Sequence, residues 1–359
     1  MTGTEGRMSK GSGPAPPTMR VYHLVRPGEL RLDRMERPEP EDGEIVARVS
    51  LALTCGTDVK TVERGHARLR VPGLLGHEWA GRVESIGAGV VNFKPGDRIV
   101  ATPTAPCGDC AYCLAGTENL CLHLFDHTAL GAYGEYILVP RHIVNRNAFR
   151  VPDSVSDVRA AFLEPLACVV HGADLLEISG DRTLVFIGDG PIALLFMQVA
   201  RLRGAGRIAL IGRSPRRLEV ARQLGADLVL DSGESDAREG IAALSDGLGA
   251  DSVVEVVGRP EVWEEAVTYA RRGGEVLFFG GCERGSTVTL DTERVHYDEL
   301  ILKGGFHYTP DSVRRAWELI NDGTLKLDPL VTHRMTLEEL PAALERVRRR
   351  EAVKIAIIP

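Results

Sequence analysis

The sequence predicts a two-domain α/β protein in which a barrel-like β domain accompanies a doubly wound parallel sheet. Its 359 residues exceed the size at which a single hydrophobic core stops growing, so two domains are the default expectation. Short β runs divided by Gly and Pro fill the first part of the chain. Strand and helix then alternate at short spacing, which is typical of a parallel sheet covered by helices on both faces.

The β domain is expected to follow a short extension. Residues 1–18 are rich in Gly, Pro, Ser and Thr and lack the apolar segment of a signal peptide, which predicts a disordered extension. The β domain would then occupy residues 19–166, with a cysteine-rich lobe at residues 103–124. Its expected strands are residues 44–53, 81–86, 98–101 and 135–140.

The α/β domain is expected over residues 167–310, with strands at residues 183–187, 207–211, 227–230, 252–257 and 275–279. Residues 311–359 carry two amphipathic helical patterns, at 312–320 and 337–348, and then an apolar run at 353–358. A terminal strand needs a sheet to join, and the β domain offers one. This last segment is therefore predicted to return to the β domain, which leaves the α/β domain as an insertion.

Charge and hydropathy argue against several kinds of partner. The formal net charge is -7 and no long run of Lys and Arg interrupts the mixture, so nucleic acid and anionic membranes are poor candidates. No apolar stretch reaches the roughly 20 residues that span a bilayer. Together with the lack of a signal-peptide pattern, these features predict a cytoplasmic protein.

Four cysteines in a segment rich in Gly, Asp and Asn predict a structural metal site. Their spacing is C-x2-C-x2-C-x7-C. Four thiolates on a short loop suit a closed tetrahedral Zn²⁺ site with no open position for chemistry. The alternatives are an iron–sulfur cluster and unligated thiols. The four residues are Cys107, Cys110, Cys113 and Cys121.

Residues in three separate motifs form a candidate catalytic metal site. Cys55 follows an apolar strand, and His77 comes after a loop about twenty residues later. A thiolate and an imidazole are typical ligands of a zinc that keeps an open coordination position. Glu164 is the best third donor, because a carboxylate in an apolar segment is costly to bury unless it is paired or bound to metal. The alternatives are a buried small thiol, an ordinary surface histidine and a helix cap.

A glycine turn between strand and helix predicts dinucleotide binding. Gly188, Gly190, Pro191, Ile192 and Ala193 fit the pattern G-x-G-x-x-G/A. The glycines allow a tight turn and close approach of a pyrophosphate, and the helix N-terminus favours the anion. A plain Gly-rich turn is the alternative.

The end of the next strand predicts a preference for NADP over NAD, with NAD still accepted. NAD-binding units carry an acid there that holds the ribose hydroxyls, whereas this chain has Gly212. Arg213, Ser214 and Arg217 offer cations and donors for a 2′-phosphate. The alternative is a solvated helix start, with Arg217 facing water.

Taken together, these motifs resemble the zinc-containing medium-chain alcohol dehydrogenases over residues 19–359, in the branch of sorbitol or iditol (polyol) dehydrogenase and threonine dehydrogenase. The resemblance implies a GroES-like β-barrel catalytic domain and a Rossmann cofactor-binding domain. The segments that carry it are CGTD at 55–58, GHE at 76–78, KPGD at 94–97, the cysteine lobe, EPL at 164–166 and GDGPIA at 188–193.

The resemblance also implies roles for individual residues and two zinc ions per chain. Cys55 and His77 would bind the catalytic zinc, with Glu164 as the third ligand or as the residue that holds the zinc-bound water. Glu78 would be a neighbouring carboxylate that can swing onto the metal, and Thr57 would take the proton of the alcohol. Members of the family are homodimers or homotetramers, so a homo-oligomer is expected.

One residue departs from the family pattern. Alcohol and threonine dehydrogenases often carry a histidine five positions after the first zinc cysteine, and this chain has Lys60 there. The departure weakens a specific threonine dehydrogenase assignment.

The expected activity is hydride transfer between a small-molecule secondary alcohol and a nicotinamide cofactor. A carboxylate in place of a cysteine ligand makes the zinc pocket more polar, which favours a polyol, sugar or cyclitol as the substrate. The alternatives within enzymes are a ketone or aldehyde reductase and an L-threonine 3-dehydrogenase-like enzyme. The alternatives outside enzymes are a zinc-ribbon interaction module and a non-catalytic cofactor-binding protein.

Overall fold

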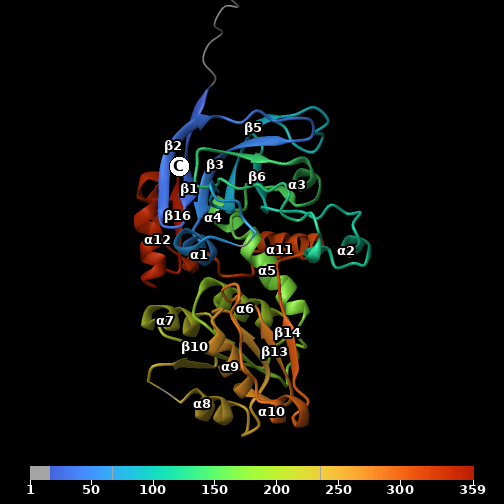
Figure 1. Ribbon diagram of the computed structural model, residues 1–359, viewed down its shortest axis with the longest axis vertical. Helices are drawn as coiled ribbons and strands as arrows, with labels where there is room; N and C mark the ends of the chain where they lie inside the picture. The colour runs from blue at the N-terminus through green and yellow to red at the C-terminus, as the bar shows by residue number, and fades with distance from the viewer. Residues whose placement is uncertain (1–16, 67, 235) are drawn as a thin grey trace, which may run out of the picture.

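The computed structural model describes residues 17–66, 68–234 and 236–359. Residues 1–16 of the predicted extension at residues 1–18 lie outside the described residues. Strand β1 begins at Thr18. In Figure 1 the blue to green N-terminal elements and the red C-terminal elements share one domain, and the yellow-green to orange elements form the other. Helices α5 (Leu163–Asp174) and α11 (Pro310–Asp322) pack against each other between the two domains.

The β domain is built around β3 (Ile45–Leu53), which pairs antiparallel with β5 (Glu78–Ile86) and β7 (Tyr136–Val139). The main sheet has the order β15-β16-β3-β5-β6-β8, and a smaller sheet has the order β2-β1-β4. Strands β3, β5, β6 and β7 confirm the four predicted β runs, although β5 begins three residues earlier than expected. The remaining strands are β1 (Thr18–Arg26), β2 (Glu29–Glu36), β4 (Gly73–Leu74), β6 (Arg98–Ala101) and β8 (Ala148–Arg150).

The C-terminal segment returns to the β domain, as predicted. Strand β16 (Lys354–Ile358) pairs antiparallel with β3 and parallel with β15 (Val331–Thr336). Helix α12 (Leu340–Arg348) lies between these two strands in the chain and buries Leu340, Ala343 and Leu344 in the β-domain core.

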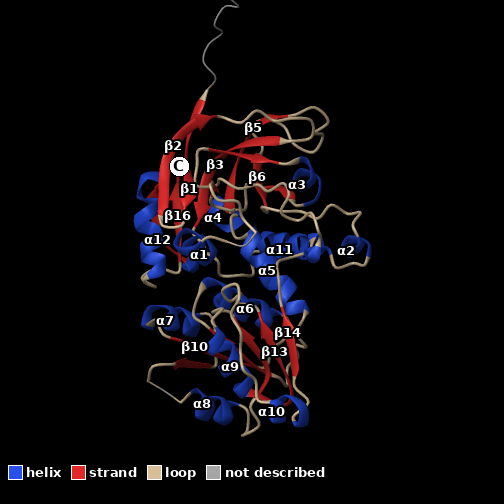
Figure 2. Cartoon of the chain, viewed as in Figure 1, coloured by secondary structure: helices blue, strands red, loops and turns tan. Residues whose placement is uncertain are grey.

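The second domain is a six-stranded parallel sheet with the order β11-β10-β9-β12-β13-β14. Alternate residues of β9 enter different cores, since Leu184 and Phe186 lie in one cluster and Val185 and Ile187 in another. Both faces are therefore covered by helices, shown in blue in Figure 2, which confirms the doubly wound prediction. The strands are β9 (Thr183–Ile187), β10 (Arg207–Gly212), β11 (Leu228–Asp231), β12 (Ala250–Glu255), β13 (Ala270–Phe278) and β14 (Ile301–Gly304).

Among the predicted strands, β13 shows the largest difference between the expected and the observed first residue. It begins at Ala270, whereas the sequence predicts a start at residue 275. Ala270 pairs with Ala250 before the register shifts, and the pair Gly273-Gly274 interrupts the apolar pattern in between. The covering helices are α6 (Pro191–Leu202), α7 (Pro215–Gln223), α8 (Ala237–Leu244), α9 (Pro260–Tyr269) and α10 (Thr292–Tyr297). Within the described ranges, no helix combines the length and apolarity needed to cross a bilayer.

The order of the strands fixes where a ligand can enter the parallel sheet. The chain runs from β9 outward to β10 and β11 on one side, and then crosses to β12, β13 and β14 on the other. Open α/β sheets bind ligands at the carboxyl ends of the strands where the order reverses. In this sheet that point lies between β9 and β12, directly at the glycine turn that follows β9.

A buried charged residue marks the seam where β16 joins the β domain. The Lys354 side chain is 1% exposed, and its ammonium donates a hydrogen bond of 3.1 Å to the Thr54 carbonyl. It also pairs with the buried carboxylate of Glu78 at the start of β5. Although burial lowers it, the pKa of Lys354 is raised overall because of the Glu78 carboxylate. The seam thus depends on a charge pair withdrawn from water.

We expect Lys354→Met to lower the free energy of unfolding by about 3–5 kcal/mol, because it leaves the Glu78 carboxyl buried without its partner. Urea unfolding followed by circular dichroism measures the effect. Lys94→Met removes an exposed lysine from a surface turn and serves as the control, with an expected change within about 0.5 kcal/mol. Equal stability of the two variants would show that the seam does not need the pair.

Candidate active site and metal centres

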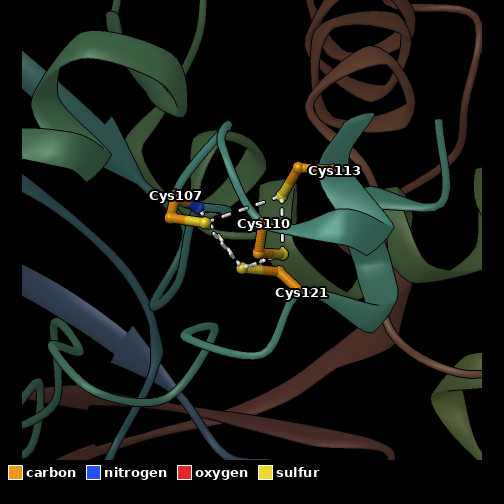
Figure 3. Close-up of side chains that lie close together, drawn as sticks. All are labelled: Cys107, Cys110, Cys113 and Cys121. Carbon is orange, nitrogen blue, oxygen red and sulfur yellow. Dashed lines mark hydrogen bonds between the residues drawn. The ribbon is translucent and has the colours of Figure 1, made fainter. Parts of the chain in front are cut away.

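The four cysteines of the lobe converge as predicted. Their side chains point toward one another in Figure 3, and one ligand atom of each lies within 4.8 Å of the others. The Sγ atoms of Cys107 and Cys121 are 3.5 Å apart, and those of Cys110 and Cys121 are 3.9 Å apart. Four sulfurs at Zn–S distances near 2.3 Å on a tetrahedron would be about 3.8 Å apart. The sulfur set therefore has the dimensions of a zinc site.

Backbone donors support negative charge on these sulfurs. The N–H groups of Cys107 and His123 each donate to Cys121 Sγ at 3.3 Å, and that of Gly108 donates to Cys113 Sγ at 3.4 Å. The cysteines are free, not joined in disulfides. Apart from the two small helices α2 (Ala111–Leu114) and η1 (Glu118–Leu120), the lobe has little regular structure to hold it.

The second group of candidate metal ligands consists of Cys55, His77 and Glu78, again with one ligand atom each within 4.8 Å of the others. The pairing of β3 with β5 brings them together, because Leu53 lies opposite Glu78 in the register. Cys55 then caps helix α1 (Gly56–Arg64), and its Sγ accepts from the Thr57 N–H at 3.4 Å.

Asp58 and Tyr133 hold His77 in place. Asp58 Oδ1 lies 3.3 Å from His77 Nδ1, and Asp58 Oδ2 accepts a hydrogen bond of 2.6 Å from the Tyr133 hydroxyl. Although burial raises it, the pKa of Asp58 is lowered overall because of these contacts. With Nδ1 on Asp58, Nε2 is the ring atom that remains to bind a metal. Neither Asp58 nor Tyr133 had been assigned a role from the sequence.

Glu78 has one oxygen satisfied and one free. Oε2 pairs with Lys354, whereas Oε1 is buried without a hydrogen-bond partner among the described residues. Burial raises the pKa of Glu78 to about 7, against the opposing effect of Lys354. A cation at the cluster would favour the ionised form of this carboxyl and would satisfy the free oxygen. The donor set therefore fits a metal ion.

The other predicted catalytic residues lie around this cluster. Glu164, in the first turn of α5, is not part of the group of three, and its Oε1 accepts from Cys168 Sγ at 3.6 Å. Its charge nevertheless raises the pKa of Glu78, so the two carboxylates are neighbours. Thr57 is exposed in the first turn of α1, and Lys60 donates a hydrogen bond of 3.1 Å to the Val257 carbonyl of the parallel-sheet domain.

The glycine turn has the geometry that the sequence predicts. Gly188 has φ 121°, and Gly190 is the N-cap of α6, with Pro191 at its first position and Ile192 next. A Cβ atom on Gly188 would lie 2.8 Å from Val256 Cγ2, so only glycine fits. A Cβ atom on Gly190 would meet open space, which leaves the helix N-terminus accessible to an anion.

The predicted phosphate-binding residues differ from one another in their surroundings. Gly212 ends β10, and Arg213 is exposed. Arg217 is only 7% exposed, so the alternative in which it faces water is wrong. Its guanidinium lies 3.4 Å from Asp189 Oδ1 and donates to the Ala352 carbonyl, so it is already engaged within the chain. Ser214 is also buried, and its hydroxyl donates to the Arg350 carbonyl at 3.4 Å.

Comparisons with known families match both domains. Residues 41–153 match the alcohol dehydrogenase GroES-like domain, and residues 191–322 match the zinc-binding dehydrogenase domain. The chain is 31% identical over 331 residues to the sorbitol dehydrogenase of Halalkalibacterium halodurans, which covers 90% of this chain and 94% of that protein. It is 30% identical over 353 residues to D-arabinitol dehydrogenase 1 of Uromyces fabae, which covers 96% and 98% of the two chains.

Solved structures agree in fold over nearly the whole chain. A zinc-binding dehydrogenase from Sinorhizobium meliloti, with NADP bound, has a TM-score of 0.87 and 32% identity and covers 96% of this chain and 100% of its own. Alcohol dehydrogenase TADH from Thermus sp. ATN1 has a TM-score of 0.86 and 28% identity, with coverage of 95% and 99%. Both domains and their order thus recur together. The chain belongs to the zinc-containing medium-chain alcohol dehydrogenases, in the branch that includes the sorbitol and threonine dehydrogenases.

Proposed function

We propose that the Cys55, His77 and Glu78 cluster holds the catalytic zinc of a dehydrogenase that acts on polyols, sugars or cyclitols and prefers NADP. The free oxygen of Glu78 carries the proposal, because a buried carboxylate oxygen without a donor, beside a thiol and an imidazole, calls for a cation. In this proposal Glu164 lies next to the metal ligands and holds the water, and the cysteine lobe holds a second, structural zinc.

The residues of the chain have distinct tasks in the reaction. Bound zinc would acidify the substrate hydroxyl, and the nicotinamide would accept the hydride. Asp58 fixes the ring of His77, and Lys354 compensates the charge of Glu78. Thr57, two residues after Cys55 and exposed, can accept one proton while it donates another, so it passes the proton of the alcohol toward solvent.

Two observations support a hydroxyl-rich substrate. Glu164 places a carboxylate beside the cluster, and carboxylates bind hydroxyl groups well. Several relatives at about 30% identity are named as dehydrogenases of sorbitol and D-arabinitol. Others are named L-threonine 3-dehydrogenase, so an amino alcohol is the second candidate. The same site also serves the reverse reaction, reduction of a ketone. A homodimer or homotetramer in the cytoplasm stays a prediction.

A substrate panel tests the proposed class. Turnover of sorbitol, D-arabinitol, L-threonine and 1-butanol is measured with NADP and with NAD by absorbance of the reduced cofactor. We expect the polyols to give the highest kcat/KM. A clear preference for 1-butanol over every polyol would contradict the assignment, and a preference for L-threonine would select the second candidate.

The ligand assignment predicts that His77→Ala reduces the zinc content from two ions per chain to one and lowers turnover by roughly a thousandfold or more, because several kcal/mol of transition-state stabilisation are lost. Elemental analysis and initial rates give the two readouts. His296→Ala removes an exposed histidine on α10 and should retain both zinc ions and full activity. A His77→Ala enzyme with near-native turnover would refute the assignment.

For the lobe, Cys107→Ser is expected to remove the other zinc ion and to destabilise the protein, because structural zinc contributes directly to folding. Thermal unfolding and aggregation of Cys107→Ser are compared with those of Cys282→Ser, whose thiol lies outside the lobe. A Cys107→Ser protein as stable as the Cys282→Ser control would argue against a structural role of the lobe zinc.

A further inference from the structure

Asp189, the second residue of the glycine turn, occupies the space beside the end of β10. A Cβ atom added to Gly212 would lie 2.6 Å from Asp189 Cβ and 2.9 Å from Asp189 Oδ2. It would also lie 2.8 Å from Leu218 Cδ2. No side chain therefore fits at position 212 while Asp189 is in place. A carboxylate therefore lies beside the position at which NAD-binding units carry their acid, but it comes from the glycine turn that follows β9.

The Asp189 carboxylate is engaged within the protein. Its Oδ2 accepts hydrogen bonds from the backbone N–H groups of Arg213 at 2.8 Å and Ser214 at 2.7 Å. Its Oδ1 pairs with the Arg217 guanidinium at 3.4 Å, and both side chains are less than a tenth exposed. The charge of Asp189 is thus compensated, and three of the roughly four acceptor positions of its carboxylate are already occupied within the chain.

The pair of Asp189 and Arg217 also connects the glycine turn to the β domain. Arg217 Nε donates a hydrogen bond of 3.1 Å to the Ala352 carbonyl, just before β16. The side chain of Arg217 is therefore held on two sides, by Asp189 and by the β domain. It is buried as a structural cation and does not project into the crevice.

Arg213 is the arginine that remains available. Its side chain is exposed, and its Nε donates a hydrogen bond of 3.1 Å to Ser232 Oγ, in the loop after β11. Among the described residues, no carboxylate pairs with it. The contact with Ser232 fixes the guanidinium at the carboxyl end of β10 and leaves its two Nη groups for a ligand. A planar guanidinium of this kind binds a phosphate through two parallel hydrogen bonds.

We infer that Asp189 and Gly212 form an exchanged pair that selects the cofactor: the acid has moved from the end of β10 into the glycine turn, where Arg217 compensates it, and Arg213 binds the 2′-phosphate of NADP. This inference rests on the proposed function, since it assumes that the crevice binds a nicotinamide dinucleotide. It changes the role predicted for Arg217 from a phosphate ligand to a positioning residue. It also means that an acid cannot be introduced at position 212 unless Asp189 is removed.

The test uses the full-length, zinc-loaded protein and measures dissociation constants of NADPH and NADH by fluorescence titration, without need of a substrate. The unmodified protein should bind NADPH more tightly. Arg213→Gln should weaken NADPH roughly tenfold or more and change NADH less than about twofold, because a charge-assisted hydrogen bond to the 2′-phosphate is lost. Ser232→Ala should weaken NADPH to a smaller extent, since Arg213 loses its support.

A double-mutant cycle tests the exchange itself. Asp189→Gly alone should retain the preference for NADPH, and Gly212→Asp alone should weaken both cofactors because its side chain has no room. The double variant D189G/G212D should bind NADH more tightly than NADPH. Circular dichroism checks that each variant is folded. If Gly212→Asp does not fold, the double variant still tests the exchange, because it removes both Asp189 contacts and leaves the movable end of the Leu218 side chain to shift.

Each outcome separates the inference from the proposed function. If Gly212→Asp alone folds and reverses the preference, or if Arg213→Gln leaves the ratio of the two constants unchanged, the exchanged pair is wrong. If the unmodified protein binds NADH more tightly than NADPH, the exchanged pair is also wrong, but the dehydrogenase assignment stands. If the unmodified protein binds neither cofactor, the proposed function itself fails.

Discussion

The antiparallel register of β3 and β5 determines where chemistry can occur in this protein. Because Leu53 lies opposite Glu78, the residues that follow β3 meet the first residue of β5 and the residue before it at one end of the strand pair. Cys55, His77 and Glu78 occupy these positions. A slip of one residue would turn the Glu78 side chain to the other face of the sheet and separate the three ligand atoms. The register of the two strands therefore also fixes the positions of the three candidate ligands.

Residues near the end of the chain connect the candidate metal ligands to the glycine turn. Lys354 compensates the carboxylate of Glu78, and the carbonyl of Ala352, two residues earlier, accepts from Arg217 beside the glycine turn. The Arg350 carbonyl accepts from Ser214 in the same region. Three residues within five positions of the chain thus contact either the candidate ligand Glu78 or the residues around the glycine turn. Because they belong to the β domain, they hold the parallel sheet against the part of the chain that carries the candidate ligands.

The sequence predicted those parts of the site that depend on local spacing. The four cysteines of the lobe and the glycine turn each lie within a short segment, so their residue types and intervals were sufficient. The roles of Lys354 and Asp189 depend on contacts with residues that are distant in the sequence, and local spacing does not reveal such contacts. Lys354 lies 276 residues from Glu78, and the Asp189 carboxylate meets backbone groups 24 and 25 residues away. The one available signal for Lys354 was a lysine inside an otherwise apolar terminal strand.

Helix α1 shows how the departure from the family pattern at Lys60 fits this arrangement. Cys55, one of the three candidate metal ligands, is the N-cap of this helix, and Thr57 lies in its first turn. One turn further along, Lys60 reaches across to the Val257 carbonyl, just beyond β12 at the reversal point of the parallel sheet. Burial lowers the pKa of Lys60, and the charge of Arg64 adds to that effect. A histidine, with its shorter side chain, would not extend as far toward Val257. The substitution thus replaces a residue that titrates near neutral pH with a longer side chain that connects the helix capped by Cys55 to the loop just beyond β12.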